Sequence, residues 1–309
     1  MKILILGSNG LVGSSVVQKL QSLEDKNINV FASTRKDTNL FSLEETRKLV
    51  DSYQPNVIVN AAAKVGGILA NNEKRTEFIL ENLKINMNLL ESIISKNKIK
   101  LINLGSSCIY PLDASNPIKE SSLMTGKLEP TNSPYAMAKI CAIEIGDSLS
   151  KQFGHKINNL MPTNLYGPND HFSERDSHVI PGLFYRLQKA KNNSESEFKV
   201  WGTGAPLREF LFNRDLADAI YFVIENDITE NLINVGSGFE ISIKELIYEI
   251  NKLVKFEGSI VFDPSLPDGN PRKLLDTSLL DRYGWKPNTK FSDGLEQTYK
   301  WFLENIKVT

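Results

Sequence analysis

Residues 1–13 constrain the fold of this chain more strongly than any other stretch. Residues 2–6, KILIL, are a short continuous apolar run, which is typical of a strand buried on both faces of a parallel sheet. The sequence GSNGLVG follows, with Gly7, Gly10 and Gly13, and SSVVQKLQSL then shows helical periodicity. Glycines between a strand and a helix permit a tight turn and a close backbone approach, so a dinucleotide pyrophosphate can rest on the helix N-terminus. The segment therefore predicts a dinucleotide-binding unit.

Strand and helix patterns alternate along the first half of the chain. We expect further strands at residues 28–34, 56–63 and 99–105 and from 156 onward, with helices at 41–53, 73–96 and 130–153 between them. This alternation predicts an α/β fold of the Rossmann type, a doubly wound parallel sheet with helices on both faces.

The alternation weakens beyond residue 166. Residues 261–276, VFDPSLPDGNPRKLLD, are dense in Asp, Pro and basic residues and predict a loop rather than a core element. We therefore expect a dinucleotide-binding Rossmann domain over residues 1–165, to which a strand and helix near 233–254 return. Residues 166–309 are expected to form a smaller, mixed α/β substrate domain that ends in a helix at about 293–305.

The end of the second predicted strand indicates which dinucleotide binds. A site that selects NAD usually places a carboxylate about 20 residues beyond the glycines, where it holds the ribose hydroxyls. This window instead holds Ser33, Thr34, Arg35 and Lys36. A guanidinium suits a 2′-phosphate, so the window favours NADPH, although two solvated surface cations are the alternative.

Tyr135 and Lys139 lie four residues apart in a predicted helix, so their side chains share one face. A nearby ammonium favours the ionised form of a phenol, and such a tyrosine can transfer protons near neutral pH. Ser106 follows a predicted strand, and the ends of parallel strands open onto the ligand crevice. We therefore expect Ser106, Tyr135 and Lys139 to converge on one carbonyl oxygen. A tyrosine and a lysine at this spacing also occur in helices as packing and a solvated charge.

Composition excludes several other classes. The net charge of −1 and the 24% of charged residues indicate neither nucleic-acid binding nor attachment to a membrane surface. No apolar run reaches transmembrane length, and Gly7 and Asn9 cut the first one short, so we expect a soluble, cytoplasmic protein. Two cysteines, Cys108 and Cys141, form no disulfide framework and suggest no metal site.

Nine segments, spread over nearly the whole chain, carry a resemblance to a known family. They are GSNGLVGSS, AAAKVGGILAN, LGSSCIYP, EPTNSPYAMAKI, MPTNLYGPND, SHVIPGL, REFL, INVGSG and PDGNPRKLLD. In this order they resemble the GDP-L-fucose synthase family, the 3,5-epimerase-4-reductases of GDP-4-keto-6-deoxy-mannose in the extended short-chain dehydrogenase/reductase superfamily. The resemblance implies NADPH as cofactor and a GDP-4-keto-6-deoxy sugar as substrate. It also implies a homodimer formed through a four-helix interface of the helices near 73–96 and 133–153.

The resemblance also assigns roles to residues. It makes Ser106, Tyr135 and Lys139 the reductase triad. It also makes Cys108 and His178 the acid/base pair of epimerisation, in which we expect Cys108 to be the base and His178 the acid, with the reverse assignment left open. The implied cofactor contacts are Gly7, Asn9, Gly10, Leu11, Val12, Gly13, Arg35, Leu40, Ala62, Ala63, Leu104, Gly105, Ser106, Tyr135, Lys139, Pro162, Thr163, Asn164, Leu165 and His178. The implied substrate contacts are Ser107, Cys108, Asn164, Arg186, Trp201, Arg208, Asp268 and Lys273. Asn9 departs from the family, which often has an arginine there, so NADP preference depends more heavily on Arg35.

Several alternatives stay open. The nearest is an enzyme that only reduces carbon 4 of a related GDP-4-keto-6-deoxy sugar, such as a heptose. Others are a dehydratase or epimerase that recycles bound NAD, and a non-catalytic nucleotide-binding regulator. For Cys108, the alternative role is that of a small buried apolar side chain, which is what a free cysteine usually is.

Overall fold

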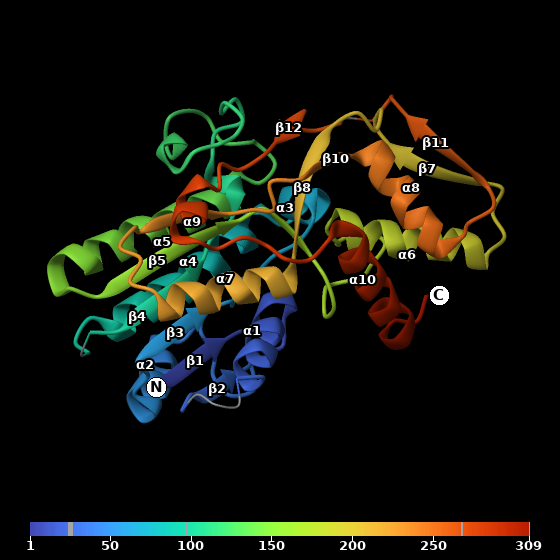
Figure 1. The fold of residues 1–309 in the computed structure, drawn as a ribbon. Helices are drawn as coiled ribbons and strands as arrows, with labels where there is room; N and C mark the ends of the chain where they lie inside the picture. The colour runs from blue at the N-terminus through green and yellow to red at the C-terminus, as the bar shows by residue number, and fades with distance from the viewer. Residues whose placement is uncertain (24–26, 97, 267, 309) are drawn as a thin grey trace.

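The computed structural model describes residues 1–23, 27–96, 98–266 and 268–308. Its main feature is a parallel six-stranded sheet in the order β2-β1-β3-β4-β5-β9 (Figure 1). The strands are β1 (Lys2–Leu6), β2 (Asn29–Ser33), β3 (Val57–Asn60), β4 (Lys100–Leu104), β5 (Lys156–Pro162) and β9 (Leu232–Val235). The reversal of direction on either side of β1 and β3 is the doubly wound topology that the sequence predicts, so the fold class is confirmed.

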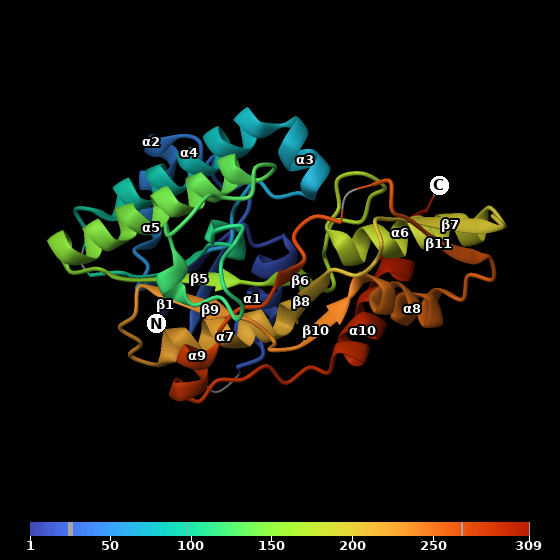
Figure 2. The same ribbon diagram turned by 90° about the horizontal axis from the view of Figure 1, so that it is seen from above.

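Helices cover both faces of this sheet, as Figure 2 shows for α4 and α5 on one side and α7 on the other. One face packs against α1 (Leu11–Gln21), α7 (Asn213–Glu225) and the short α9 (Ser278–Tyr283). The opposite face packs against α2 (Leu43–Tyr53), α4 (Arg75–Ile93) and α5 (Ser133–Phe153). Along β1, Ile3 and Ile5 join the first of these cores and Leu4 and Leu6 join the second, which explains why the strand is apolar throughout. Burial of each such side chain contributes roughly 1.5–3 kcal/mol.

The second region is built around β8 (Leu207–Phe212). This strand pairs antiparallel with β10 (Glu240–Ser242) and parallel with β12 (Arg272–Lys273) and β6 (Asn164–Tyr166). A separate parallel pair joins β7 (Glu197–Trp201) and β11 (Ser259–Asp263). These strands share a core with α6 (Val179–Asn192), α8 (Ile243–Val254) and α10 (Phe291–Asn305). The remaining elements are α3 (Ile68–Glu73) and 3-10 turns at Ser107–Ile109 and Glu120–Ser122.

Two expectations need correction. Residues 261–263 belong to β11 and residues 272–273 to β12, so the segment predicted as a loop contains parts of two strands. The strand near residue 233 joins the large sheet as expected, whereas helix α8 packs in the second core. A domain boundary at residue 165 stays a prediction.

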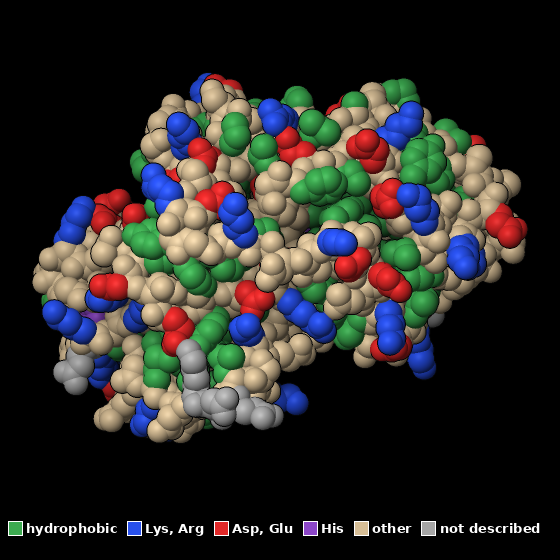
Figure 3. All heavy atoms as spheres, viewed as in Figure 1, with side chains coloured by type: hydrophobic (Ala, Val, Ile, Leu, Met, Phe, Trp, Pro, Cys, Tyr) green, Lys and Arg blue, Asp and Glu red, His purple; other side chains and the backbone are tan. Residues whose placement is uncertain are grey.

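Charged side chains of both signs are interspersed on the face shown in Figure 3. Within the described ranges, no helix is both long enough and apolar enough to span a membrane.

Candidate active site

The turn between β1 and α1 leaves no room for side chains at two of its glycines. Gly7 has a φ of +73°, and a Cβ there would lie 2.8 Å from Ala62 Cα. A Cβ on Gly13 would lie 2.1 Å from the carbonyl oxygen of Gly7. Gly10 is the N-cap of α1 and provides no side-chain cap, so the N–H groups of the first helical turn are left for a ligand. This cradle fits a dinucleotide pyrophosphate.

Asparagine side chains hold the strand end next to this turn. Asn60, at the end of β3, accepts a hydrogen bond from Ala62 N at 3.2 Å and donates to Asn86 and Asn103. Asn103 in turn donates to Asn159 on β5 at 3.1 Å. These buried amides fix the backbone at Ala62, which lies against Gly7.

Arg35 lies just beyond β2 and is exposed. The neighbouring carboxylate, which the sequence analysis did not consider, belongs to Asp37 and accepts hydrogen bonds from Thr34 N at 2.8 Å and Thr34 Oγ1 at 2.7 Å. These bonds lower the pKa of Asp37. Within the described part of the chain, no residue forms an ion pair with Arg35, so its guanidinium is available to a phosphate.

Tyr135 and Lys139 share one face of α5, as predicted. Lys139 is 2% exposed, and its Nζ donates to the carbonyl oxygen of Leu104 at 2.7 Å and lies 5.7 Å from the centroid of the Tyr135 ring. Burial lowers the pKa of Lys139 to about 8. Burial and the nearby Cys108 raise the pKa of Tyr135, against a smaller opposing effect of the Ser106 hydroxyl. The ammonium lies over the ring, but burial moves the pKa of the phenol in the direction opposite to the one that the sequence analysis expected.

Cys108 lies in the 3-10 turn that follows β4 and is half-buried. Ser106 caps this turn by accepting a hydrogen bond from Cys108 N at 3.2 Å, while Ser107 is buried inside it. Two donors reach the sulfur: Asn132 Nδ2 at 3.5 Å and Lys273 Nζ at 3.8 Å. The sequence analysis missed Asn132, although NSPY suggests a helix start.

His178 is the N-cap residue of α6 and is exposed. The surrounding protein atoms and then His171 lower its pKa, although solvent reaches the residue. In the described chain no hydrogen bond joins His178 to Cys108. Its loop does touch the rest of the site, because Gly67 N donates to the carbonyl oxygen of Asp176 at 3.0 Å. Asp170, in the same loop, is buried, and burial raises its pKa to about 7.

Residues 162–165 connect the large sheet to the second one. Thr163 Oγ1 and Asn164 Nδ2 both donate to the carbonyl oxygen of Glu209, at 3.1 and 2.9 Å. The Glu209 carboxylate is fully buried and accepts from Gly238 N at 2.8 Å and Leu275 N at 3.0 Å. Burial raises the pKa of Glu209. This residue, which the sequence analysis did not select, holds three chain segments around β8.

Other predicted cofactor residues have mainly backbone roles in the structure. Gly105 N donates to the carbonyl oxygen of Leu160 at 2.8 Å, and a Cβ on Gly105 would lie 2.0 Å from Met161 Cε. The carbonyl oxygen of Leu40 accepts from Asn88 at 2.8 Å.

The predicted substrate residues form two clusters. Arg186 lies over the rings of Phe198 and Trp201, at 5.7 and 6.0 Å from their centroids, and Trp201 is 52% exposed. Arg208 donates to the carbonyl oxygen of Asn270 at 2.5 Å. Burial lowers the pKa of both arginines.

Asp268 accepts from Thr203 N at 2.6 Å and from Thr203 Oγ1 at 2.8 Å, so it joins the loop after β7 to the segment before β12. Arg208 pairs with Lys273 in the β8–β12 register, which places their side chains on the same face of that sheet. Lys273 thereby connects the cluster of Arg208 and Asp268 to Cys108.

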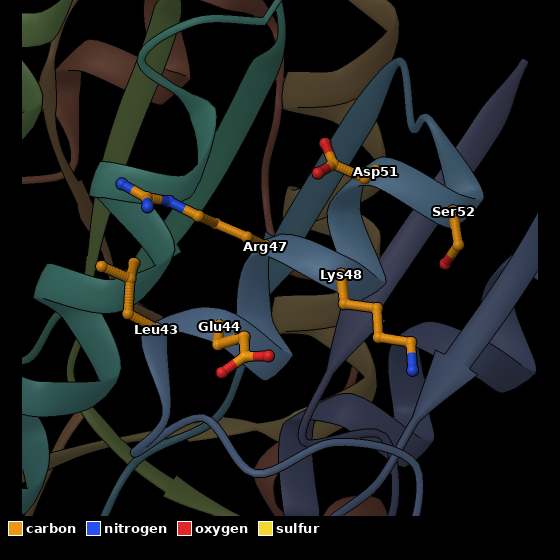
Figure 4. A pocket seen from close by; sticks show the side chains of 6 residues that line it. All are labelled: Leu43, Glu44, Arg47, Lys48, Asp51 and Ser52. Atoms are coloured by element: carbon orange, nitrogen blue, oxygen red, sulfur yellow. The ribbon is translucent and has the colours of Figure 1, made fainter.

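A surface depression on the outer side of α2 contains none of these residues. Figure 4 shows its lining side chains, Leu43, Glu44, Arg47, Lys48, Asp51 and Ser52. Arg47 pairs with Glu91 and Asp51 pairs with Lys96, so its charged groups are largely satisfied. Among the residues that the structure describes, no group of three or more His, Cys, Asp or Glu side chains is placed to hold a metal ion.

Comparisons with known proteins place this chain in a family. Residues 3–236 match the model of the NAD dependent epimerase/dehydratase family. GDP-L-fucose synthase 1 of Arabidopsis thaliana is 45% identical over 305 residues, which are 99% of this chain and 94% of that protein. A GDP-L-fucose synthetase from Naegleria fowleri, solved bound to NADP, is 29% identical with a TM-score of 0.90 and covers 98% of this chain and 94% of its own.

A GDP-6-OMe-4-keto-L-xylo-heptose reductase from C. jejuni is also 29% identical with a TM-score of 0.90, covering 99% of this chain and 98% of its own. Because the relatives match over nearly their full lengths, the chain belongs to the NAD dependent epimerase/dehydratase family and, within it, to the GDP-L-fucose synthases.

Proposed function

We propose that this chain converts GDP-4-keto-6-deoxy-mannose to GDP-L-fucose by 3,5-epimerisation followed by NADPH-dependent reduction of carbon 4. One observation carries the proposal: at the carboxyl end of β4 the half-buried Cys108 lies close to Tyr135, whose ring lies under the buried ammonium of Lys139. That set offers a base and a proton donor next to a dinucleotide cradle. The full-length similarity to GDP-L-fucose synthases supports the same reaction.

Epimerisation uses the ketone at carbon 4, which acidifies the hydrogens on carbons 3 and 5 because the carbanion delocalises onto oxygen as an enolate. At each of the two carbons, Cys108 removes the ring proton and His178 delivers a proton to the opposite ring face. Between the two epimerisations Cys108 releases its proton to solvent and His178 takes one up. A thiol and an imidazole have ordinary pKa values of about 8.5 and 6.5, so both groups exchange protons near neutral pH. Ser106 and Tyr135 donate hydrogen bonds to the enolate oxygen.

Reduction then uses the same two donors. NADPH, when bound, supplies the hydride for carbon 4. The glycine cradle holds its pyrophosphate, Arg35 holds the 2′-phosphate, and Lys139 bonds the nicotinamide ribose. Tyr135 gives its proton to the new alkoxide, and the raised pKa of the phenol keeps that proton in place until then. Epimerisation precedes reduction, because reduction removes the ketone that acidifies the ring hydrogens.

The second region holds the nucleotide. Arg186 and Arg208 neutralise the diphosphate, and the exposed face of Trp201 packs on the base or sugar. Asp268 fixes the loop at Thr203 and orders this side of the site.

We further propose a cytoplasmic homodimer. Helices α4 and α5 expose large apolar side chains, Leu80 and Met87 on the first and Met137 and Phe153 on the second, and such patches favour a protein interface. The two cysteines are free, which suits a reducing compartment. Analytical ultracentrifugation of the wild type and of Met87→Lys tests the dimer, which the variant should weaken.

The decisive experiment follows NADPH oxidation with GDP-4-keto-6-deoxy-mannose and determines the stereochemistry of the product. We expect one NADPH per turnover and GDP-L-fucose as product; a product epimerised at neither carbon excludes the epimerase activity. Incorporation of solvent deuterium at carbons 3 and 5 without NADPH tests epimerisation alone.

A second candidate is reduction of carbon 4 only, on a GDP-4-keto heptose, and the similarity to the C. jejuni heptose reductase favours it. Oxidation of NADPH with that substrate, combined with no deuterium exchange in the mannose compound, would identify it. Turnover without net NADPH consumption would instead indicate an NAD-recycling enzyme.

A further inference from the structure

Asn132 is the N-cap residue of α5, but its side chain does not form the usual capping hydrogen bond. It precedes α5, where an asparagine normally accepts a bond from an N–H group in the first turn, but here no side-chain cap is present. Its Nδ2 instead donates to Cys108 Sγ at 3.5 Å. The residue gives up a stabilising cap for contact with the sulfur, and departures of this kind are expected at functional sites.

The turn that carries Asn132 is fixed from two sides. The Glu129 carboxylate accepts from Thr131 N, Thr131 Oγ1 and Asn132 N, at 3.1, 2.5 and 3.1 Å. Arg75 of α4 donates to the carbonyl oxygens of Pro130 and Thr131, at 2.8 and 3.3 Å. The amide of Asn132 is therefore held in place before any substrate arrives.

Lys273 approaches the same sulfur from the second region. Its Nζ lies 3.8 Å from Cys108 Sγ, and the residue is half-buried on β12. In the part of the chain that the structure describes, Lys273 forms no ion pair with a carboxylate, so its charge is available to the sulfur. Among the residues that the structure describes, the titratable groups that interact with Cys108 include Lys273 from β12 and Tyr135 from α5. Negative charge on Cys108 raises the pKa of Tyr135, which links the two groups electrostatically.

We propose that Asn132 and Lys273 are positioning residues that hold the sulfur of Cys108 as a thiolate and aim it at the sugar ring. The inference rests on the proposed function, in which this thiolate forms an S–H bond with a ring proton while the C–H electron pair enters the enolate. Lys273 then acts through Cys108 in addition to any contact with the diphosphate. Lys273 lies on β12 in the second region, whereas Cys108 follows β4 of the large sheet. The proposed thiolate therefore depends on residues from both regions.

The test measures the thiolate directly. Full-length protein is alkylated with iodoacetamide from pH 6 to 9, a reaction in which sulfur forms a bond to carbon and iodide leaves, and peptide mass spectrometry follows each cysteine. Cys141, also free and half-buried, is the reference in the same molecule. Lys273→Met should slow Cys108 by about tenfold, the effect of losing one nearby opposite charge.

Asn132→Ala should slow Cys108 by about threefold, because one neutral hydrogen bond is lost, and Lys273→Arg should restore most of the wild-type rate. Arg272→Met is the matched control, since Arg272 is the next residue on β12 and pairs with Glu240 instead. It should leave Cys108 unchanged. Circular dichroism is the control that each variant is folded.

An unchanged ratio of Cys108 to Cys141 alkylation in folded Lys273→Met and Asn132→Ala overturns the inference. The proposed function has its own readout in wild-type protein, namely deuterium exchange and NADPH oxidation. If both occur while the alkylation ratios do not change, only the role of Asn132 and Lys273 fails. If neither occurs, the proposed function fails.

Discussion

The two regions that build the candidate site are held together in different ways. In the large sheet, the strands that precede Gly7, Gly105 and Thr163 pair in continuous parallel register, and apolar cores cover both faces. In the second region, β6, β10 and β12 have three residues or fewer, and a single buried carboxylate, Glu209, receives N–H groups from two further segments. The cofactor side thus depends on distributed packing, whereas the substrate side depends on a few buried polar atoms.

The largest expected effect lies on the cofactor side. Tyr135→Phe removes the proposed proton donor and keeps the ring that packs on Phe78 and Lys139. We expect NADPH oxidation to slow by about 10³-fold, within the usual range for loss of a general acid. The affinity for NADPH, measured by fluorescence titration, should change little. A rate within threefold of wild type would remove Tyr135 from the chemistry.

A smaller effect is expected where the second region depends on Glu209. Glu209→Gln keeps the shape but leaves one N–H group of Gly238 or Leu275 facing an amide nitrogen, so unfolding in urea should require about 2 kcal/mol less free energy. The KM for the GDP-sugar should rise more than the KM for NADPH. Glu249→Gln, a surface change at a pair with Lys252, should alter stability by less than about 0.5 kcal/mol. Equal effects of the two variants would mean that the second region does not depend on the buried Glu209 carboxylate.

The same contrast explains what the sequence was able to predict. The glycine turn and the pairing of Tyr135 with Lys139 follow from local spacing, so the fold class and the facing side chains were predictable. The end of strand β11 was missed because Asp263 and Pro264 directly follow its apolar residues and its partner, β7, lies far earlier in the chain.

Residues that act across long separations carried no local signal. Glu209 lies in REFL, yet its hydrogen-bond partners are 29 and 66 residues away. The direction of the pKa shift of Tyr135 was not predicted, because a four-residue spacing places a cation near the ring but does not reveal how deeply both groups are buried. Burial dominates the pKa of the phenol.

Selection of the dinucleotide offers a more local test on the cofactor side. Arg35→Ala removes the exposed guanidinium assigned to the 2′-phosphate, so the KM for NADPH should rise about tenfold, as expected for loss of a charge-assisted contact. The KM for NADH should stay the same. Lys36→Ala is the matched control, and an equal loss in both variants would indicate general attraction of phosphate rather than a specific contact.

The smallest expected effect is a pH dependence. As pH rises, Lys139 should weaken NADPH binding but make folding more favourable. Burial lowers the pKa of Lys139 from 10.5 to about 8, so the ammonium that we propose to bind the ribose is present below pH 8 and is lost above it. The kcat/KM for NADPH should therefore fall to about half of its plateau near pH 8, because this parameter reports groups of the free enzyme.

The contribution of Lys139 to the free energy of unfolding changes with pH in the opposite direction. Between pH 8 and 10.5 the unfolded lysine binds more protons than the folded one, so this residue makes folding more favourable as pH rises. Thermal unfolding followed over the same pH range should show that contribution in wild type and not in Lys139→Met. A loss of NADPH binding that parallels a loss of stability would mean that alkaline unfolding, rather than this lysine, causes the decline.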